Sequence, residues 1–256
     1  MRFLLQFIRV IYTVYGFTLF ILVLLLIFPF VIIASLFGKI KGGNFIYKLC
    51  SIWSDIVLFF LGIRHTIMYE APHDINRQYV FVFNHISFLD GAILVKTIRH
   101  QPIRVLGKAE MAKVPVFGFL YKYVVVLVLR DKADKRAKSV LQLKSVLNKG
   151  ISVLLSPEGT FNLTDKPLKE FYDGAFKIAI ETQTPIKPIL FLDTYDRMHY
   201  RSIFSINPGR SRAVYLEEVK VDGLGLADVP FLKTKVYNLM QEKLIQYKAS
   251  WIKKDK

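Results

Sequence analysis

The sequence of 256 residues has only one cysteine, so an intrachain disulfide is impossible. It also lacks the ligand spacing of zinc sites, a recognisable nucleic-acid-binding module and the Gly-x-Ser-x-Gly elbow that exposes a nucleophilic serine. No internal repeats and no low-complexity stretches are present. These absences argue against a zinc protein, a repeat protein and a serine-elbow hydrolase. The single cysteine, Cys50, lies in an apolar stretch, where we expect a packing residue.

Charged side chains are missing from Val10 to Gly38, and the part from Phe17 to Phe37 is almost wholly apolar. About 20 apolar residues suffice to cross the hydrocarbon core of a bilayer. A cleaved signal peptide is the alternative, because Arg2 and Arg9 resemble its positive start. Its apolar part should be only about 7–15 residues long and end at a small-residue cleavage site. This run is longer and ends at Lys39, so we expect a retained membrane anchor.

A second apolar stretch, Phe45–Ile63, carries Lys48 and Asp55, which suits an interfacial helix better than a full membrane span. The turn residues 42–44 separate the two stretches, and Pro29 is expected to kink or break the first. Residues 1–64 are therefore predicted to form a membrane-anchoring helical hairpin. Basic residues flank both sides of the first run, so whether the hairpin crosses the membrane or only dips into it stays open.

Acidic residues are few relative to basic ones: 20 Asp and Glu stand against 36 Lys and Arg, which gives a formal net charge of +16. A surface of this kind favours an anionic partner, either nucleic acid or an anionic bilayer. Beside a membrane anchor, the lipid surface is the simpler explanation, since each basic residue near it gains roughly 1 kcal/mol. We therefore expect an anionic membrane surface as a partner, and no nucleic acid.

After Arg64, short β-rich runs alternate with helical ones, which predicts one α/β domain over residues 65–256. Its sheet should be mostly parallel and covered by helices. The predicted strands are Tyr79–Phe83, Arg104–Leu106, Val124–Leu129, Ile151–Leu155, Ile186–Leu192 and Ser211–Val219. The predicted helices are Gly91–Ile98, Val116–Tyr121, Lys132–Lys149, Glu170–Thr182 and Val229–Lys248.

His85 and Asp90 lie in a short segment between a predicted strand and a predicted helix. Residues five apart on a continuous helix point to different sides, but a loop allows the carboxylate to fold back onto the imidazole. A carboxylate on one ring nitrogen fixes the tautomer and makes the other nitrogen a better base. The pair alone is more typical of a structural histidine and a helix-capping aspartate. In open α/β sheets, however, ligands bind beyond the carboxyl ends of strands.

Two further strand ends carry polar residues. Strand Ile151–Leu155 runs into Ser156-Pro157-Glu158-Gly159-Thr160, a tight turn that presents Glu158 and Thr160 at the rim of the sheet. Strand Val124–Leu129 runs into Arg130, whose guanidinium suits bidentate binding of phosphate. Taken singly, each is as well explained by an ordinary turn or a solvated arginine.

Together these segments resemble the lysophosphatidic acid acyltransferase family, the 1-acylglycerol-3-phosphate acyltransferases of phospholipid synthesis. Asn84-His85-x-Ser87-x-x-Asp90 resembles the first sequence block of that family. Three later blocks follow in the same order: Lys108-x-Glu110 with Pro115, Gly118 and the strand ending at Arg130; Pro157-Glu158-Gly159-Thr160; and Gly174-Ala175 with Thr184-Pro185-Ile186-x-Pro188. The resemblance covers roughly Arg64 to Leu192.

The resemblance implies a glycerolipid acyltransferase fold and transfer of an acyl chain from acyl-CoA or acyl-carrier protein to the free sn-2 hydroxyl of lysophosphatidic acid. His85 would be the general base and Asp90 would orient it, without a metal or redox cofactor. Direct transfer is simpler than an acyl-enzyme on Ser87. The residues implied in substrate binding are Asn84, Ser87, Lys108, Arg130, Glu158, Gly159 and Thr160.

One position departs from the family, which commonly has an arginine where this chain has Phe161. That arginine is thought to bind the acceptor phosphate, so phosphate binding would rest on Arg130, Lys108 and Lys169 or Lys177. A lysolipid with another head group, such as a lyso-aminolipid, is therefore an alternative acceptor. A non-catalytic basic lipid-binding membrane protein is the alternative from another class. We expect the inner (cytoplasmic) membrane as the location, with the catalytic domain on the cytoplasmic side.

Overall fold

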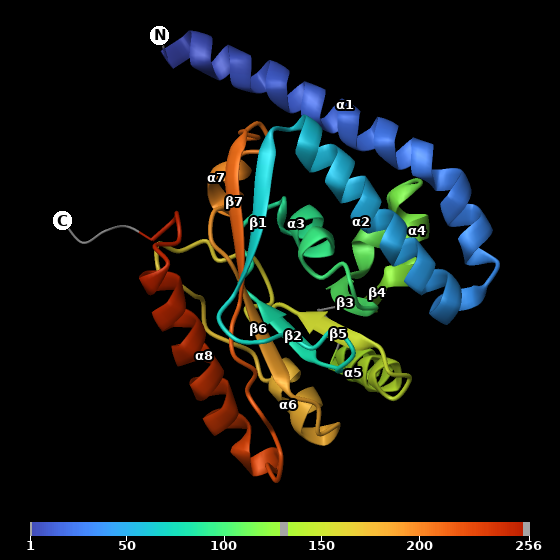
Figure 1. Ribbon diagram of the computed structural model, residues 1–256, viewed down its shortest axis with the longest axis vertical. Helices are drawn as coiled ribbons and strands as arrows, with labels where there is room; N and C mark the ends of the chain where they lie inside the picture. The colour runs from blue at the N-terminus through green and yellow to red at the C-terminus, as the bar shows by residue number, and fades with distance from the viewer. Residues whose placement is uncertain (1, 129–132, 253–256) are drawn as a thin grey trace.

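The computed structural model describes residues 2–128 and 133–252 and begins with a helical hairpin. Helix α1 (Arg2–Ser35) is followed by a short π-helix (Gly38–Gly42) and by α2 (Gly43–Phe60). Figure 1 shows α1 (blue) running over the top of the molecule and bending before it turns back into α2. Pro29 lies inside α1, so the predicted break of the helix does not occur.

Helix α2 is held against the domain that follows it by hydroxyl groups as well as by apolar contacts. Three of its side chains donate hydrogen bonds to backbone carbonyls of α3 (Asp90–Thr97) or the residue after it: Tyr47 to Ile98 at 2.8 Å, Ser51 to Val95 at 2.9 Å and Ser54 to Ala92 at 2.6 Å. The charge of Asp55 is neutralised from the same side, because Lys96 and Arg99 lie 2.8 and 2.7 Å away. These contacts fix α2 to the domain that follows it.

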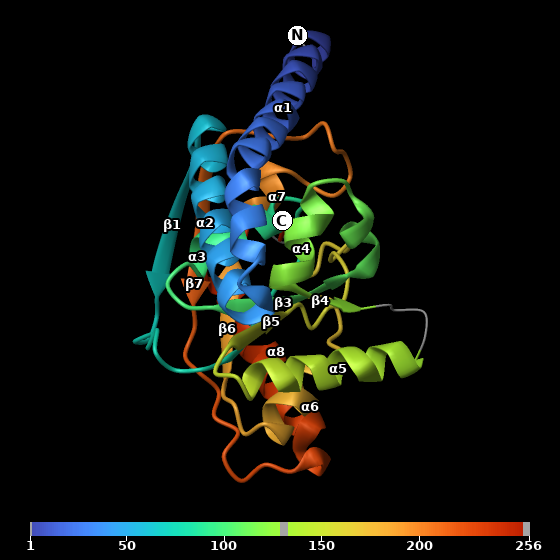
Figure 2. The same ribbon diagram turned by 90° about the vertical axis from the view of Figure 1, so that its right-hand side faces the viewer.

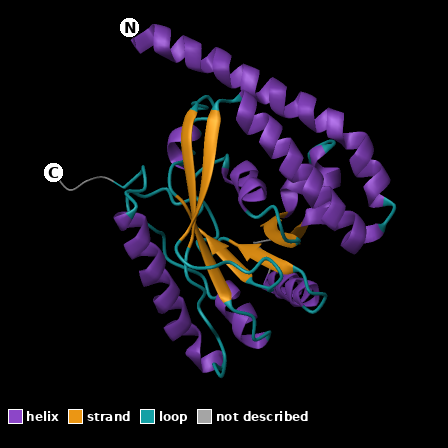
Figure 3. Ribbon diagram, viewed as in Figure 1, coloured by secondary structure: helices purple, strands orange, loops and turns teal. Residues whose placement is uncertain are grey.

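The described residues form one seven-stranded sheet with the order β1-β7-β6-β2-β5-β3-β4. Strands β1 and β7 run antiparallel to the others, which are mutually parallel. Figure 3 shows the sheet (orange) between the helices. The strands are β1 (Ile63–Tyr69), β2 (Val80–Phe83), β3 (Ile103–Lys108), β4 (Val125–Val128), β5 (Ser152–Leu155), β6 (Ile186–Phe191) and β7 (Gly209–Tyr215).

Helices cover both faces of the sheet, because successive side chains along each strand point to opposite faces. In β2, Phe81 packs with the cluster formed by α1, α2, α3 and α4, whereas Val80 and Val82 pack with α5, α6 and α8. The remaining helices are α4 (Phe117–Val124), α5 (Ala133–Leu147), α6 (Gly174–Glu181), α7 (Thr194–Arg197) and α8 (Val229–Gln246), with 3-10 turns at Ala109–Lys113 and Leu226–Asp228. The predicted α/β fold with a mostly parallel sheet is therefore confirmed.

The sequence prediction missed β1, which pairs in parallel with β7 at the edge of the sheet. It also extended two elements too far. The helix predicted from Glu170 begins only at Gly174, and the strand predicted to Val219 ends at Tyr215. Val219 instead forms an isolated bridge with Ile186, so the chain returns to the sheet after a break.

Candidate active site

The predicted site residues follow strands whose carboxyl ends meet at one edge of the sheet. His85 follows β2, the turn 156–160 follows β5, and Lys108 is the last residue of β3. These strands are parallel neighbours, so their ends lie side by side. Arg130 lies outside the described residues, and the structure does not place it.

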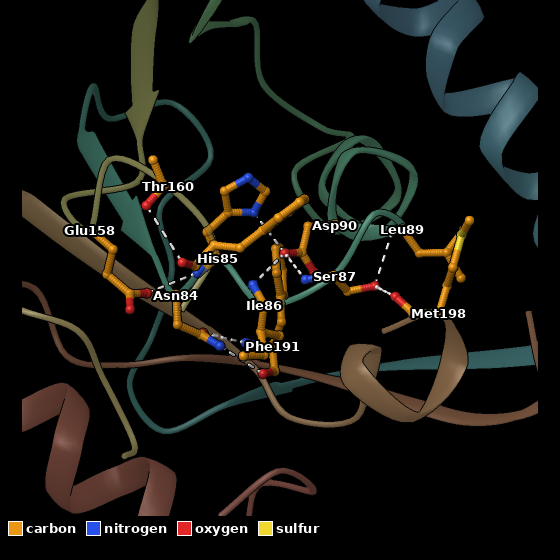
Figure 4. Close-up of polar contacts among 11 residues, drawn as sticks. Asn84, His85, Ile86, Ser87, Leu89, Asp90, Glu158, Thr160, Phe191 and Met198 are labelled. Carbon is orange, nitrogen blue, oxygen red and sulfur yellow. Dashed lines mark hydrogen bonds and ion pairs between the residues drawn. The ribbon is translucent and has the colours of Figure 1, made fainter. Parts of the chain in front are cut away.

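The imidazole of His85 and the carboxylate of Asp90 are in direct contact. Nδ1 of His85 lies 2.8 Å from Oδ2 of Asp90. The same oxygen accepts the backbone N–H groups of Ile86 at 2.8 Å and Ser87 at 2.9 Å. Asp90 is 1% exposed, whereas the His85 side chain is 28% exposed. The loop therefore wraps around a buried carboxylate and leaves the other face of the imidazole, with Nε2, open to a reactant (Figure 4).

Ser87 is fully buried and both sides of its hydroxyl are used within the protein. It donates to the backbone carbonyl of Met198 at 2.7 Å and accepts the backbone N–H of Leu89 at 3.0 Å. Figure 4 shows this chain of contacts from Leu89 through Ser87 to Met198. The geometry gives Ser87 a part in holding the loop shape, away from the open face of His85.

Asn84 is likewise buried and connects β2 to β6. Its amide nitrogen donates to the carbonyl oxygen of Phe191 at 3.0 Å, and its amide oxygen accepts the N–H of the same residue at 2.8 Å. Two hydrogen bonds to the backbone of one residue fix the point at which the chain leaves β2. Asn84 thus sets where the following residue, His85, begins its loop.

Glu158 joins the His85 loop to the turn after β5. One carboxylate oxygen accepts the backbone N–H of His85 at 2.9 Å, and the other accepts the backbone N–H of Lys169 at 2.8 Å. Glu158 is completely buried, and burial raises the pKa of its carboxyl to about 7, against the lowering effect of the two backbone hydrogen bonds. The side chain is therefore a bridge between loops and is shielded from solvent.

Gly159 and Thr160 complete this turn. Gly159 has a φ of +70° and donates its N–H to the carbonyl of Ser156 at 3.1 Å, a left-handed conformation that glycine adopts without strain. A Cβ there would also lie 2.8 Å from the ring of Tyr172. The hydroxyl of Thr160 accepts a hydrogen bond from the ammonium group of Lys169 at 2.9 Å, which brings one of the predicted phosphate-binding cations to the rim.

Phe161 packs directly on the histidine. The ring centroids of Phe161 and His85 are 4.2 Å apart, and Phe88 meets Phe161 edge-on with a centroid distance of 5.1 Å. The backbone N–H of Asn162 donates to the carbonyl of His85 at 2.8 Å, which keeps the two segments together. The residue that departs from the family pattern therefore forms an apolar wall beside the imidazole. The positions of Phe161 and His85 in the sequence gave no indication that the two side chains are in contact.

A large apolar cavity lies between the N-terminal hairpin and the domain. Its volume is about 430 Å³, and α1, α2, α3 and α4 contribute most of its lining. Phe88 and Leu89, from the loop between His85 and Asp90, are part of this lining. Cys50 also lines the cavity, and burial raises the pKa of its thiol to about 12, which keeps it neutral as a packing residue. The cavity thus begins beside the loop that carries the imidazole.

Another of the predicted cations forms an ion pair with a neighbouring aspartate. Nζ of Lys177, on α6, lies 3.8 Å from a carboxylate oxygen of Asp173 in an exposed ion pair.

Within residues 2–128 and 133–252, no three His, Cys, Asp or Glu side chains are grouped in a way that would hold a metal ion. The arrangement offers an oriented imidazole, an apolar cavity and nearby lysines, which is suited to proton transfer from a hydroxyl on an amphipathic molecule.

Comparison with known proteins agrees with this architecture. The Acyltransferase family model matches residues 63–192, about half of the chain, so the protein belongs to the acyltransferase family. The chain is 30% identical over 186 residues to 1-acyl-sn-glycerol-3-phosphate acyltransferase alpha of Mus musculus, covering 71% of this chain and 64% of that protein. It is 25% identical over 184 residues to the human beta enzyme of the same name, covering 72% of this chain and 66% of the human one.

The match thus spans somewhat less than two thirds of these relatives. A solved structure extends the likeness of fold to the N-terminal hairpin. The crystal structure of the 1-acyl-sn-glycerophosphate (LPA) acyltransferase PlsC from Thermotoga maritima superposes with a TM-score of 0.75 at 20% identity, covering 99% of this chain and 100% of that one. The shared fold therefore includes α1 and α2.

Proposed function

We propose that this protein is a 1-acyl-sn-glycerol-3-phosphate acyltransferase, which transfers an acyl chain from a thioester to the sn-2 hydroxyl of lysophosphatidic acid to give phosphatidic acid. The observation that carries the proposal is the 2.8 Å contact between His85 and Asp90 beside an apolar cavity that Phe88 and Leu89 help to line. The match to the acyltransferase family and the names of the relatives support the same reaction.

In the proposed mechanism, Nε2 of His85 accepts the proton of the acceptor hydroxyl as its oxygen attacks the thioester carbonyl. Asp90, bound to Nδ1, keeps the imidazole in the required tautomer and stabilises the imidazolium. Collapse of the tetrahedral intermediate breaks the carbon–sulfur bond, and the imidazolium returns its proton to the departing thiolate. An ester and a free thiol result, and the scheme uses only side chains of the protein and its two substrates.

The apolar cavity is the proposed place for the acyl chain of the donor, which is acyl-CoA or acyl-carrier protein. A volume of about 430 Å³ corresponds to a chain of many methylene groups, and burying each stabilises the complex by about 0.8 kcal/mol. Because Phe88 and Leu89 line the cavity, the thioester at the end of the chain would lie close to the loop of His85.

The protein is proposed to work at a membrane, with α1 partly submerged in it. Residues 6–35 are long and apolar enough to cross a bilayer, yet 28% of the most apolar window is buried inside the protein. One side of α1 packs on α2: the hydroxyl of Tyr12 donates to the carbonyl of Leu61, just after α2, at 2.7 Å, and the indole of Trp53 on α2 donates to the carbonyl of Phe20 at 3.3 Å. The other side exposes large apolar residues, among them Phe7, Ile11, Leu22, Leu26, Phe30 and Ile33. A helix that exposes apolar side chains on one side and packs on the protein with the other fits a position at the membrane interface.

The net charge of +16 supports an anionic lipid surface, and we place the domain on the cytoplasmic side, where anionic lipid gathers. The head group of the proposed acceptor carries a phosphate. Phe161, which packs on His85, has no charge that could bind this phosphate. The proposed phosphate contacts are therefore Lys169 near Thr160, together with Lys108 and Arg130.

A panel of lysolipids tests the proposal. Purified protein is offered acyl-CoA and acyl-carrier protein with lysophosphatidic acid, lyso-aminolipids and uncharged monoacylglycerol, and thiol release is measured. We expect turnover with lysophosphatidic acid that falls by about 100-fold or more in His85→Ala. The surface variant His100→Ala serves as the matched control and should keep full activity. Equal or better turnover without a phosphate on the acceptor would contradict the substrate, and undiminished release in His85→Ala would contradict the base.

A further inference from the structure

The segment His199–Ile206, between α7 and β7, forms an outward loop that passes beside α1. Figure 2 shows this loop (orange) beside the first half of α1, next to α7. Two successive large side chains point outward from it: Ile203 is 49% exposed and Phe204 is 46% exposed. Ile206, at the end of the segment, is buried. Single exposed apolar side chains are common on proteins, but those that extend a larger apolar patch mark a contact surface.

The surface of the segment adjoins that of the helical hairpin that we place in the membrane. A Cβ on Gly16 of α1 would lie 2.9 Å from the side chain of Ile206 and 3.1 Å from Leu61, so the glycine allows helix and loop to touch. Burial, then the charge of Arg201, then that of Arg9 from α1 lower the pKa of His199. The loop and the amino-terminal half of α1 therefore form one surface.

The same segment borders the apolar cavity. Ile203 and Ile206 belong to its lining, together with Met198, which precedes the segment, and with Gly16 and Phe17 of α1. Ile203 is at once half exposed and part of the lining, so the cavity reaches the surface between this loop and α1. An acyl chain that moves between the cavity and a bilayer would pass this point.

The segment is also tied to the loop that carries the imidazole. The carbonyl of Met198 accepts the hydroxyl of Ser87 at 2.7 Å, and Ser87 and His199 form an isolated β-bridge. The segment also carries a cation stacked on an aromatic ring: the guanidinium of Arg201 lies 5.9 Å from the ring centroid of Tyr200. Arginine and tyrosine beside apolar residues are typical of a segment at the level of lipid head groups.

We propose that His199–Ile206 is a second membrane-contacting element, which inserts Ile203 and Phe204 among the lipid acyl chains at the mouth of the cavity. The partner is the bilayer itself, since the surface continues that of α1 and combines apolar side chains with Arg201 and Tyr200. This inference rests on the membrane attachment within the proposed function and is independent of the identity of the acceptor. With this segment in the bilayer, an acyl chain would pass from the lipid into the cavity beside His85 without crossing water.

Tryptophan reporters test this in the full-length protein reconstituted into phosphatidylcholine–phosphatidylglycerol vesicles, with and without lipids brominated along their chains. Both natural tryptophans, Trp53 and Trp251, are buried, and their signal is subtracted by comparison with the unmodified protein. The reporter is Phe204→Trp. Leu22→Trp, on the exposed side of α1, reports attachment of the hairpin, and Phe231→Trp, 61% exposed on α8, is the control away from the membrane.

We expect brominated lipid to remove roughly half or more of the emission added by Phe204→Trp and Leu22→Trp, and to leave that of Phe231→Trp unchanged, because apolar side chains of interfacial elements reach about 5–10 Å into the bilayer. Ile203→Trp is a second reporter should the first disturb the loop. Quenching of Leu22→Trp without quenching at positions 203 and 204 would overturn the role of the segment while attachment stands. Absence of quenching at all reporters would overturn attachment itself, and acyl transfer in detergent would remain a separate measurement.

Discussion

The carboxylate of Glu158 accepts a hydrogen bond from the backbone N–H of His85 at 2.9 Å, so the turn after β5 holds the loop after β2 at its second residue. The same side chain also accepts the N–H of Lys169, which brings the ammonium of that lysine to Thr160. One buried carboxylate therefore positions both the proposed base and a proposed phosphate-binding cation. Its burial has a cost that depends on pH.

We expect native stability to fall as pH rises from about 4.5 to about 7, in part because of Glu158. Burial raises the pKa of its carboxyl from the usual 4.5 to about 7 in the folded protein. In this window the folded protein holds a proton that the unfolded chain has released, so raising pH favours unfolding. In Glu158→Gln this part of the pH dependence should disappear, as measured by thermal unfolding in detergent over a pH series. Glu170→Gln, at an exposed position nearby, is the control, and a retained pH slope in Glu158→Gln would contradict the assignment.

Asp90→Asn should reduce turnover about 100-fold to 10,000-fold with little change in KM, because it removes the charge that stabilises the imidazolium while keeping the shape of the side chain. The amide oxygen can still accept the backbone N–H groups of Ile86 and Ser87, so the loop should persist. Steady-state kinetics with matched circular dichroism measure this. Asp74→Asn on the surface should behave as the unmodified protein, and a fully active Asp90→Asn would show that Asp90 only shapes the loop.

Asn84→Ala should lower the free energy of unfolding by about 2–4 kcal/mol, since it leaves the N–H and the carbonyl of Phe191 buried without their side-chain partner. Activity per folded molecule should also fall, because the start of the His85 loop is no longer fixed to β6. Urea unfolding and thiol release measure the two effects. Asn76→Ala, at an exposed position, controls for the loss of an asparagine; equal stability of the two variants would contradict the role of Asn84.

Cys50→Phe should shift the donor preference toward shorter acyl chains, because the ring would fill part of the cavity that Cys50 lines. Excluding three or four methylene groups at about 0.8 kcal/mol each corresponds to a loss of about 100-fold in kcat/KM for long-chain donors. Short-chain donors should be nearly unaffected. Cys50→Ala, which opens the cavity, should retain long-chain activity, and an unchanged chain-length profile in Cys50→Phe would place the acyl chain elsewhere.

The order of elements was largely readable from the sequence, because buried parallel strands are short apolar runs and helices carry their own periodicity. Tyr79–Phe83, Ile151–Leu155 and Ile186–Leu192 correspond to β2, β5 and β6. Strand β1 was missed because it follows an apolar helix at once and pairs with β7, some 150 residues later in the chain. No local sequence pattern indicates that a strand pairs with another so far away in the chain.

The apolar hairpin, the alternation of strands and helices, and the position of His85 and Asp90 after a strand could all be predicted from the amino-acid sequence. These depend on local hydrophobicity and on spacing along the chain. Three contacts became visible only in the folded protein: Ser87 donates to Met198, 111 residues away, Asn84 forms two hydrogen bonds with Phe191, and Phe161 lies against the imidazole. Such contacts depend on how loops from different strands meet at one edge of the sheet, where each buried polar group needs a hydrogen-bond partner.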